Sequence, residues 1–102
     1  MSATLQVIYP AAEGSRFDMD YYTETHLPMV GTHWGPLIER TLVTRGLAGG
    51  PDVPAGYHAI ASIVFKDADA LNTALETGGP LIADIENFTD CPVQMLIGEV
   101  VG

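Results

Sequence analysis

Basic residues are scarce in this sequence. Four Lys and Arg stand against thirteen Asp and Glu among 102 residues, which gives a formal net charge of -9. The four (Arg16, Arg40, Arg45 and Lys66) are scattered along the chain, so they predict no basic surface that could neutralise phosphates. We therefore expect no nucleic acid and no anionic membrane among the partners. The acidic excess needs no explanation beyond solubility.

Cysteines and long hydrophobic runs are lacking as well. Cys91 is the single cysteine, which excludes a disulfide framework and a Cys/His zinc motif. Its neighbour Asp90 disfavours the thiolate, which argues against a nucleophilic role. No segment approaches the ~18 apolar residues that a membrane-spanning helix needs. Residues 1–6 have neither the basic nor the apolar region of a secretory signal, so we expect a cytoplasmic protein.

Motifs for common cofactors are missing too. There is no Gly-x-Gly-x-x-Gly, no phosphate loop and no recognisable Ser/His/Asp order, so we expect no cofactor. His26 and His33 are seven residues apart on one predicted helix, which separates them by ~10 Å and prevents them from sharing a metal ion. We interpret His33 as a satisfied polar residue at the helix end and His58 as a residue on a strand face. No metal site is expected.

The pattern of apolar residues predicts a single domain, 1–102, of the α+β class. Alternation of side chains indicates strands at 3–9, 37–45, 57–65 and 93–101, and helical periodicity indicates helices at 18–34, 68–77 and 81–88. The order strand, helix, strand, strand, helix, strand is that of a ferredoxin-like β-α-β-β-α-β fold. We expect a four-stranded antiparallel sheet with helices over one face.

The third and fourth predicted strands are apolar on both faces. A monomer would leave one face of the sheet in water, where polar residues are expected. Two such sheets packed back to back would bury each other, so we expect a homodimer. A cover formed by another protein is the alternative.

Residues at helix ends set the predicted boundaries. Asp18 is suited to cap the first helix, and Phe17 to pack on Tyr22. Pro28 predicts a kink or restart. Asp67 caps the second helix, Gly78 supplies a left-handed stop, and Pro80 opens the third. The spacing of one set of residues predicts an inward face of the first helix: Met19, Tyr22, His26, Met29 and His33.

Two segments together resemble the EthD family of the dimeric α/β-barrel superfamily. They are Phe17-Asp18-Met19-Asp20-Tyr21-Tyr22 with Thr25-His26-Leu27-Pro28-Met29-Val30 and Trp34, and Ala83-Asp84-Ile85-Glu86-Asn87-Phe88-Thr89. The resemblance implies a dimer with a pocket between helices and sheet in each subunit. The family takes its name from ether-degradation operons, and related branches include cofactor-free monooxygenases, muconolactone-type isomerases, haem-degrading enzymes and polyketide cyclases. It therefore implies no single chemistry.

The resemblance also singles out candidate site residues. His26 matches the family histidine, and Tyr22 and Trp34 match its aromatics. Asp84, Asn87 and Thr89 match its polar positions, of which we expect Asp84 and Asn87 to line the pocket. Tyr9 ends the first strand on the same face as Leu5 and Val7, and we expect it to reach the mouth of the pocket. A core histidine bonded to a backbone carbonyl is the structural alternative for His26, and ordinary capping and turn formation is the alternative for the polar residues.

Three functional hypotheses follow. The first is a cofactor-independent isomerase, cyclase, decarboxylase or monooxygenase acting on a small apolar carbonyl, lactone or aromatic compound. In it His26 is the general acid/base, Tyr22 or Tyr9 donates to an oxyanion, and Trp34 shapes the wall. The second is a non-catalytic module that binds a small apolar ligand for a partner oxygenase. The third is haem binding with His26 as axial ligand.

Overall fold

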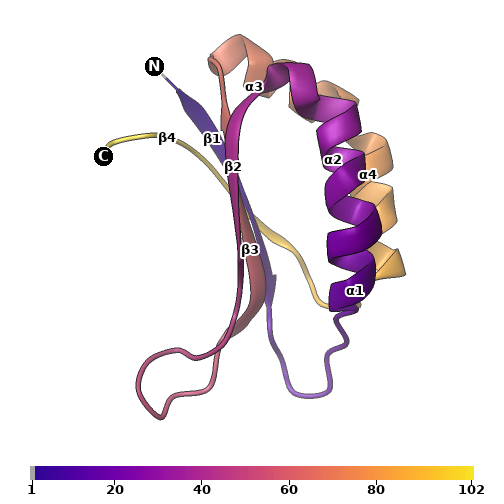
Figure 1. The fold of residues 1–102 in the computed structure, drawn as a ribbon, viewed down its shortest axis with the longest axis vertical. Coiled ribbons are helices and arrows are strands. Elements are labelled where there is room, and N and C mark those ends of the chain that lie inside the picture. Colours follow the sequence, from indigo (N-terminus) through magenta and orange to yellow (C-terminus); the bar gives the residue numbers. More distant parts are fainter. Residues whose placement is uncertain (1) are drawn as a thin grey trace.

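The computed structural model describes residues 2–102 and contains one layer of strands and one layer of helices (Figure 1). The strands are β1 (Ala3–Pro10), β2 (Ile38–Arg45), β3 (Tyr57–Phe65) and β4 (Gln94–Glu99). They form an antiparallel sheet in the order β2-β3-β1-β4. This confirms the predicted α+β class and the four-stranded antiparallel sheet.

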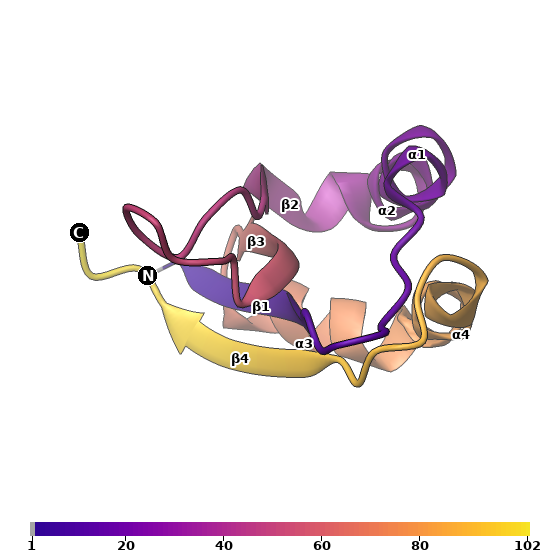
Figure 2. The same cartoon turned by 90° about the horizontal axis from the view of Figure 1, so that it is seen from below.

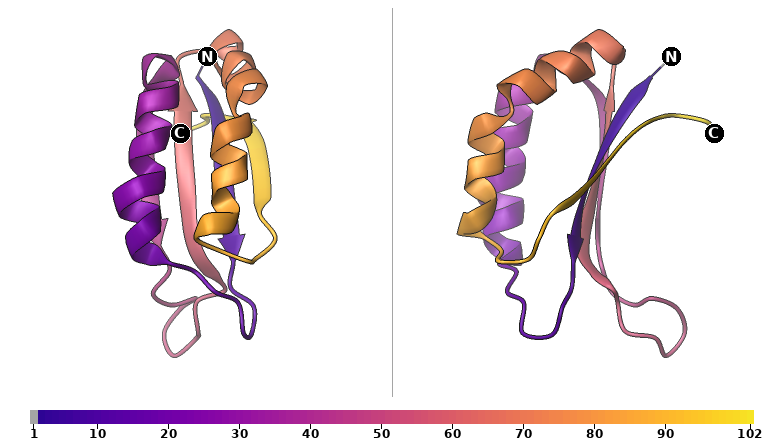
Figure 3. Two further views of the ribbon diagram at one scale, coloured as in Figure 1. Left: turned by 90° about the vertical axis from the view of Figure 1, so that its right-hand side faces the viewer. Right: turned by 180° about the vertical axis from the view of Figure 1, so that it is seen from behind.

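The helices all lie over one face of the sheet (Figure 3). The first is a continuous stretch made of α1 (Met19–Tyr21), a π-helical turn (Tyr22–His26) and α2 (Leu27–Trp34). The others are α3 (Ala68–Thr77) and α4 (Gly79–Asp84), with short 3-10 turns at Gly35–Leu37 and Ile85–Asn87. Seen from below, the first helix and α4 lie next to each other on the same side of the sheet (Figure 2). Within residues 2–102, no helix is long and apolar enough to span a membrane.

The inner face of the sheet forms one wall of the core. Along β1 every second residue is buried, and these residues are Ala3, Leu5, Val7 and Tyr9. Leu5 pairs with Ile63 of β3 and Val7 with Ala61, so buried residues of neighbouring strands point to the same side. This alternation is the one that the sequence predicts for the first strand.

Beside Pro28 the helix changes type and α2 begins, which agrees with the expected restart rather than with a kink. The chain forms a π-helical turn just before the proline, in which the N–H of Leu27 bonds to the carbonyl of Tyr22, five residues back. A π turn holds one more residue than an α turn, so later side chains rotate relative to the helix face. Trp34 is consequently buried and His33 is exposed. The prediction that His33 faces the core is therefore wrong.

The helix caps agree with the sequence except at Gly78. Asp18 accepts a hydrogen bond from the N–H of Tyr21 at 3.0 Å, and Asp67 accepts one from Ala70 at 2.8 Å. Gly78 has φ -81°, so it is not the left-handed stop that we expected. A Cβ atom there would lie 2.9 Å from Cζ2 of Trp34, so this glycine allows close packing of the indole ring.

The outer face of the sheet is uncovered and partly apolar. Leu42 of β2 and Leu96 of β4 lie on this face and are 69% and 54% exposed. Between them, Gln6 donates a hydrogen bond to Ser62 at 3.0 Å. On the inner side, Met95 and Ile97 of β4 are also about half exposed, because no helix covers that edge.

Replacing Gly78 by alanine should destabilise the fold, because the new methyl group would overlap the Trp34 ring. Overpacking of this kind costs about 1–3 kcal/mol of the free energy of unfolding. Gly79→Ala is the matched control, since a Cβ at Gly79 meets no atom within 4 Å. Urea unfolding of both variants checks the prediction, and equal stability of the two would contradict it.

Candidate functional site

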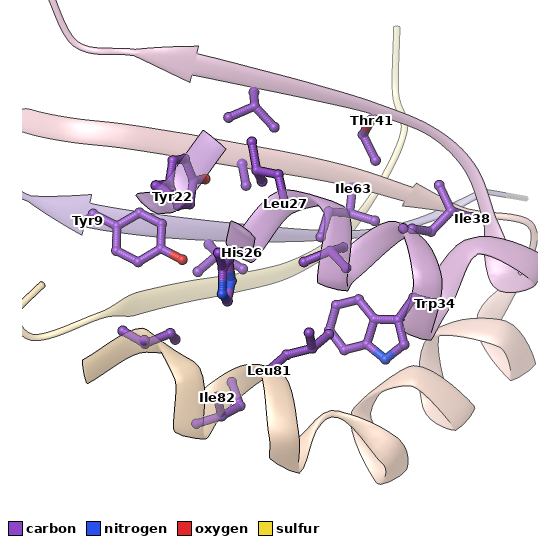
Figure 4. Close-up of a pocket in the computed structure, with 16 residues that line it drawn as sticks. Tyr9, Tyr22, His26, Leu27, Trp34, Ile38, Thr41, Ile63, Leu81 and Ile82 are labelled. Atoms are coloured by element: carbon purple, nitrogen blue, oxygen red, sulfur yellow. The ribbon is translucent and has the colours of Figure 1, made fainter. Parts of the chain in front are cut away.

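A mostly apolar cavity of about 180 Å³ lies between the inner face of the sheet and the helices (Figure 4). Its wall includes exposed residues at Gly31, Thr41 and Val43, where the cavity opens between α2 and β2. The side chains that carry polar atoms are few. The lining residues are Val7, Tyr9, Tyr22, His26, Leu27, Val30, Gly31, Trp34, Ile38, Thr41, Val43, Ala61, Ile63, Leu81, Ile82 and Ile85.

His26 belongs to the wall of this cavity and is only 5% exposed. Its ring stacks on Tyr22, with the centroids 5.8 Å apart, and lies 4.7 Å from the Phe88 ring. Nδ1 of His26 lies 2.9 Å from Oδ2 of Asp84. With Nδ1 engaged by a carboxylate, Nε2 is the ring nitrogen left for a ligand. A neutral imidazole held in this way presents a lone pair at Nε2.

Asp84 is a buried carboxylate that receives three hydrogen bonds. Besides His26, the hydroxyl of Tyr21 donates to Oδ1 at 2.7 Å and the side-chain amide of Asn87 donates to Oδ1 at 3.0 Å. Burial raises the pKa of Asp84, but the bonds from Asn87, His26 and Tyr21 outweigh it, so the pKa lies below its ordinary value. The carboxylate is thus ionised behind His26.

Four of the six predicted site residues meet at the cavity, and two do not. Tyr9, Tyr22, His26 and Trp34 line it, although the sequence places them on three separate turns of a helix and the end of a strand. Asp84 and Asn87 do not line it, which corrects their expected position. They lie behind His26, because Asp84 ends α4 on the side that packs against the π-helical turn.

Tyr21 is a residue that the sequence analysis did not single out. It hydrogen-bonds to Asp84, 63 positions away in the chain. No spacing rule connects residues so far apart, so only the packing of α4 against the first helix reveals the pair. The sequence does contain one hint, the doublet Tyr21-Tyr22. Adjacent residues of a helix point in different directions, so the two tyrosines cannot both face the same side.

Two buried polar atoms of residues that line the cavity have no hydrogen-bond partner within residues 2–102. They are the hydroxyl of Tyr22 and Nε1 of Trp34. Burial raises the pKa of Tyr22 to about 12. Burial, with smaller effects of Tyr22 and Cys91, also raises the pKa of Tyr9 far above its ordinary value. Both phenols therefore keep their protons at neutral pH.

The remaining candidates have structural contacts. Nε2 of His33 lies 2.6 Å from the carbonyl of Thr77, in agreement with the interpretation of a satisfied residue at the helix end. His58 bonds to Ser15 at 2.8 Å and stacks on Phe17. Thr89 donates to the carbonyl of Arg16 at 2.6 Å, as expected for a turn residue. Residues 2–102 contain no cluster of three or more His, Cys, Asp or Glu suited to a metal ion.

The pH dependence of stability should report the ionised state of Asp84. Its pKa is lower in the folded chain than the value near 4 of an unfolded chain, so its contribution is complete above about pH 4 and is lost as the pH falls through the folded pKa. Asp84→Asn has no such contribution. The difference in free energy of unfolding between wild type and variant, from urea titrations, should therefore shrink below about pH 4. A difference that does not change with pH would contradict an ionised Asp84.

Several solved structures have the same arrangement of strands and helices. The chain resembles SnoaB, a cofactor-independent oxygenase from Streptomyces nogalater, with a TM-score of 0.59 at 14% identity over 98% of this chain and 94% of SnoaB. It also resembles an ethyl tert-butyl ether d (EthD) family protein from Bacillus halodurans, with a TM-score of 0.70 at 20% identity over 99% and 100% of the two chains. These likenesses show the fold alone, a four-stranded antiparallel sheet with helices over one face.

A third structure identifies the family. An EthD-like protein from Ralstonia eutropha is 32% identical, with a TM-score of 0.88, over 99% of this chain and 93% of its own. The chain belongs to the EthD family. No family sequence model and no curated protein matches the sequence.

Proposed function

We propose that this protein is a cofactor-independent enzyme that binds a small, mostly apolar carbonyl, lactone or aromatic compound in the cavity and uses His26 as general acid/base. The observation that carries the proposal is the 2.9 Å contact of Nδ1 of His26 with Asp84, on a ring that also lines the cavity. A histidine that serves only the core requires hydrogen bonding of its ring but no neighbouring cavity. A base needs a free nitrogen beside a site for a ligand.

The residues around His26 support proton transfer. Asp84 accepts from Nδ1–H, which fixes the tautomer with a basic Nε2 and stabilises the imidazolium once Nε2 has taken a proton. Tyr21 and Asn87 hold Asp84 in place through its second oxygen. General acid/base catalysis supplies about 10²- to 10⁴-fold of rate, so positioning within the cavity has to supply the rest. SnoaB, a cofactor-independent oxygenase, has the same fold.

The size of the cavity argues against the haem hypothesis. A volume of about 180 Å³ is below the roughly 300–1,000 Å³ of pockets for drug-sized ligands. A porphyrin is larger than such a ligand and does not fit between sheet and helices as they are packed here. We therefore set aside His26 as an axial haem ligand and keep the small-ligand proposals.

Replacing the base tests this proposal directly. With an isomerisable lactone or small cyclic ketone that raises the melting temperature, His26→Gln should lower kcat about 10²- to 10⁴-fold and leave the fold intact. His33→Gln is the matched control, because His33 is exposed and outside the cavity. Unchanged turnover in His26→Gln would overturn the catalytic role. Binding without turnover by the wild type would favour the carrier hypothesis.

We also propose that two copies associate through the outer face of the sheet. Leu42 and Leu96 are 69% and 54% exposed there, and no helix covers them (Figure 1). Burying such residues against a second copy stabilises a dimer by roughly 25 cal/mol for each Å² of apolar area removed from water. The family to which the chain belongs is part of a superfamily of dimers.

Light scattering after size-exclusion chromatography should give twice the 10.9 kDa mass of one chain. Leu42→Glu should produce a monomer, because a charge would be buried at the interface. Leu47→Glu is the control: Leu47 is 83% exposed but lies in the loop between β2 and β3. A wild-type monomer at micromolar concentration, or dissociation in both variants, would contradict this interface.

A further inference from the structure

The Tyr22 hydroxyl is one of the two buried side-chain polar groups without a hydrogen-bond partner in residues 2–102. The side chain that carries it is one of those that line the cavity. A buried hydroxyl without a partner destabilises the folded state, since it has lost its bonds to water. Phenylalanine would pack equally well without that cost. The hydroxyl therefore contributes nothing to the fold that a plain ring would not.

A second phenol lies beside it. The rings of Tyr9 and Tyr22 are 5.5 Å apart in an edge-on arrangement. In the close-up, the Tyr9 hydroxyl points toward the ring of His26 (Figure 4). Two tyrosines and one histidine thus line the same mostly apolar cavity. Since both tyrosines stay protonated at neutral pH, each can donate a hydrogen bond to an oxygen of a ligand.

The cavity limits the size of that ligand. An apolar cavity of about 150 Å³ holds one benzene molecule. The space of about 180 Å³ here accordingly fits one six-membered ring with a small substituent. The remaining lining residues, among them Val7, Ala61 and Ile63, offer the ring apolar contacts only. A polar group on the ligand has to face the tyrosines and His26.

We propose that the cavity binds one-ring phenols or cyclic enols, with the ligand oxygen between the hydroxyls of Tyr9 and Tyr22 and its proton transferred to Nε2 of His26. In this step the O–H bond of the ligand breaks, an N–H bond forms at Nε2, and the electron pair stays on the ligand oxygen. No electron is gained or lost. The product is an oxyanion held by two donors, next to an imidazolium that Asp84 stabilises.

This inference rests on the proposed function and narrows it. Among the carbonyl, lactone and aromatic compounds considered there, it selects those with an ionisable hydroxyl. A plain ketone or lactone would accept hydrogen bonds from the tyrosines but would bring no O–H proton for His26. Discrimination between a phenol and its methyl ether is therefore the property to measure.

The test uses 4-nitrophenol and 4-nitroanisole, which share a ring and differ in the acidic proton. Binding is followed by calorimetry and by the visible band of 4-nitrophenolate, at a pH below the pKa of the free phenol. We expect the wild type to bind the phenol about tenfold or more tightly than the ether, with the phenolate band present. Tyr22→Phe should lose the preference and the band, yet melt at the same or a higher temperature without ligand.

Tyr9→Phe provides a second reading should Tyr22→Phe fail to fold, and Tyr57→Phe is the control, because Tyr57 is 46% exposed and outside the cavity. Equal binding of phenol and ether, no binding of either, or a preference that survives both cavity variants would overturn the inference. Turnover of a ketone or lactone without phenol binding would leave the His26 proposal intact. A phenolate band in a protein that turns over no substrate would support the phenol-binding inference and contradict the proposed catalysis.

Discussion

The buried carboxylate of Asp84 is the constraint on which the arrangement of the helices depends. A carboxylate that is 8% exposed has lost most of its water and must find donors within the protein. Here they come from three places in the chain: Tyr21 at the end of α1, His26 at the end of the π-helical turn, and Asn87 just after α4. The bonds from Tyr21 and His26 connect the first helix to α4 beside the part of the cavity wall that His26 forms.

The π-helical turn connects this constraint to the cavity. Pro28 donates no N–H, and the chain accommodates it with an extra residue in the preceding turn. Tyr22 and His26, at the two ends of that turn, stack with their rings nearly parallel, at 16°. The same extra residue brings Trp34 to the inner side. One irregular turn thus sets which aromatic and imidazole groups surround the cavity.

The sequence was sufficient for the fold and for part of the site. Alternation along the strands and the caps at Asp18 and Asp67 are local signals, and they predicted element bounds to within one or two residues in most cases. The outward rotation of His33 was missed, because a π turn breaks the periodicity on which the helix face was assigned. The true position of Asp84 was missed because its contacts join residues about 60 positions apart. Such contacts depend on packing, which no spacing in the sequence encodes.

The cavity lowers the free energy of unfolding relative to a fully packed core. A chain that needed only a core could fill the space with larger side chains and replace Tyr22 by phenylalanine, and both changes would favour the folded state. Instead the helices leave a cavity beside Tyr22, whose hydroxyl has no partner in residues 2–102, and beside His26, whose Nδ1 is bonded to Asp84. Membership of the EthD family explains the fold but selects no reaction. The cavity and the unpaired hydroxyl both lower stability, and neither the sheet nor the helix caps require them, which is the physical argument for the ligand site proposed above.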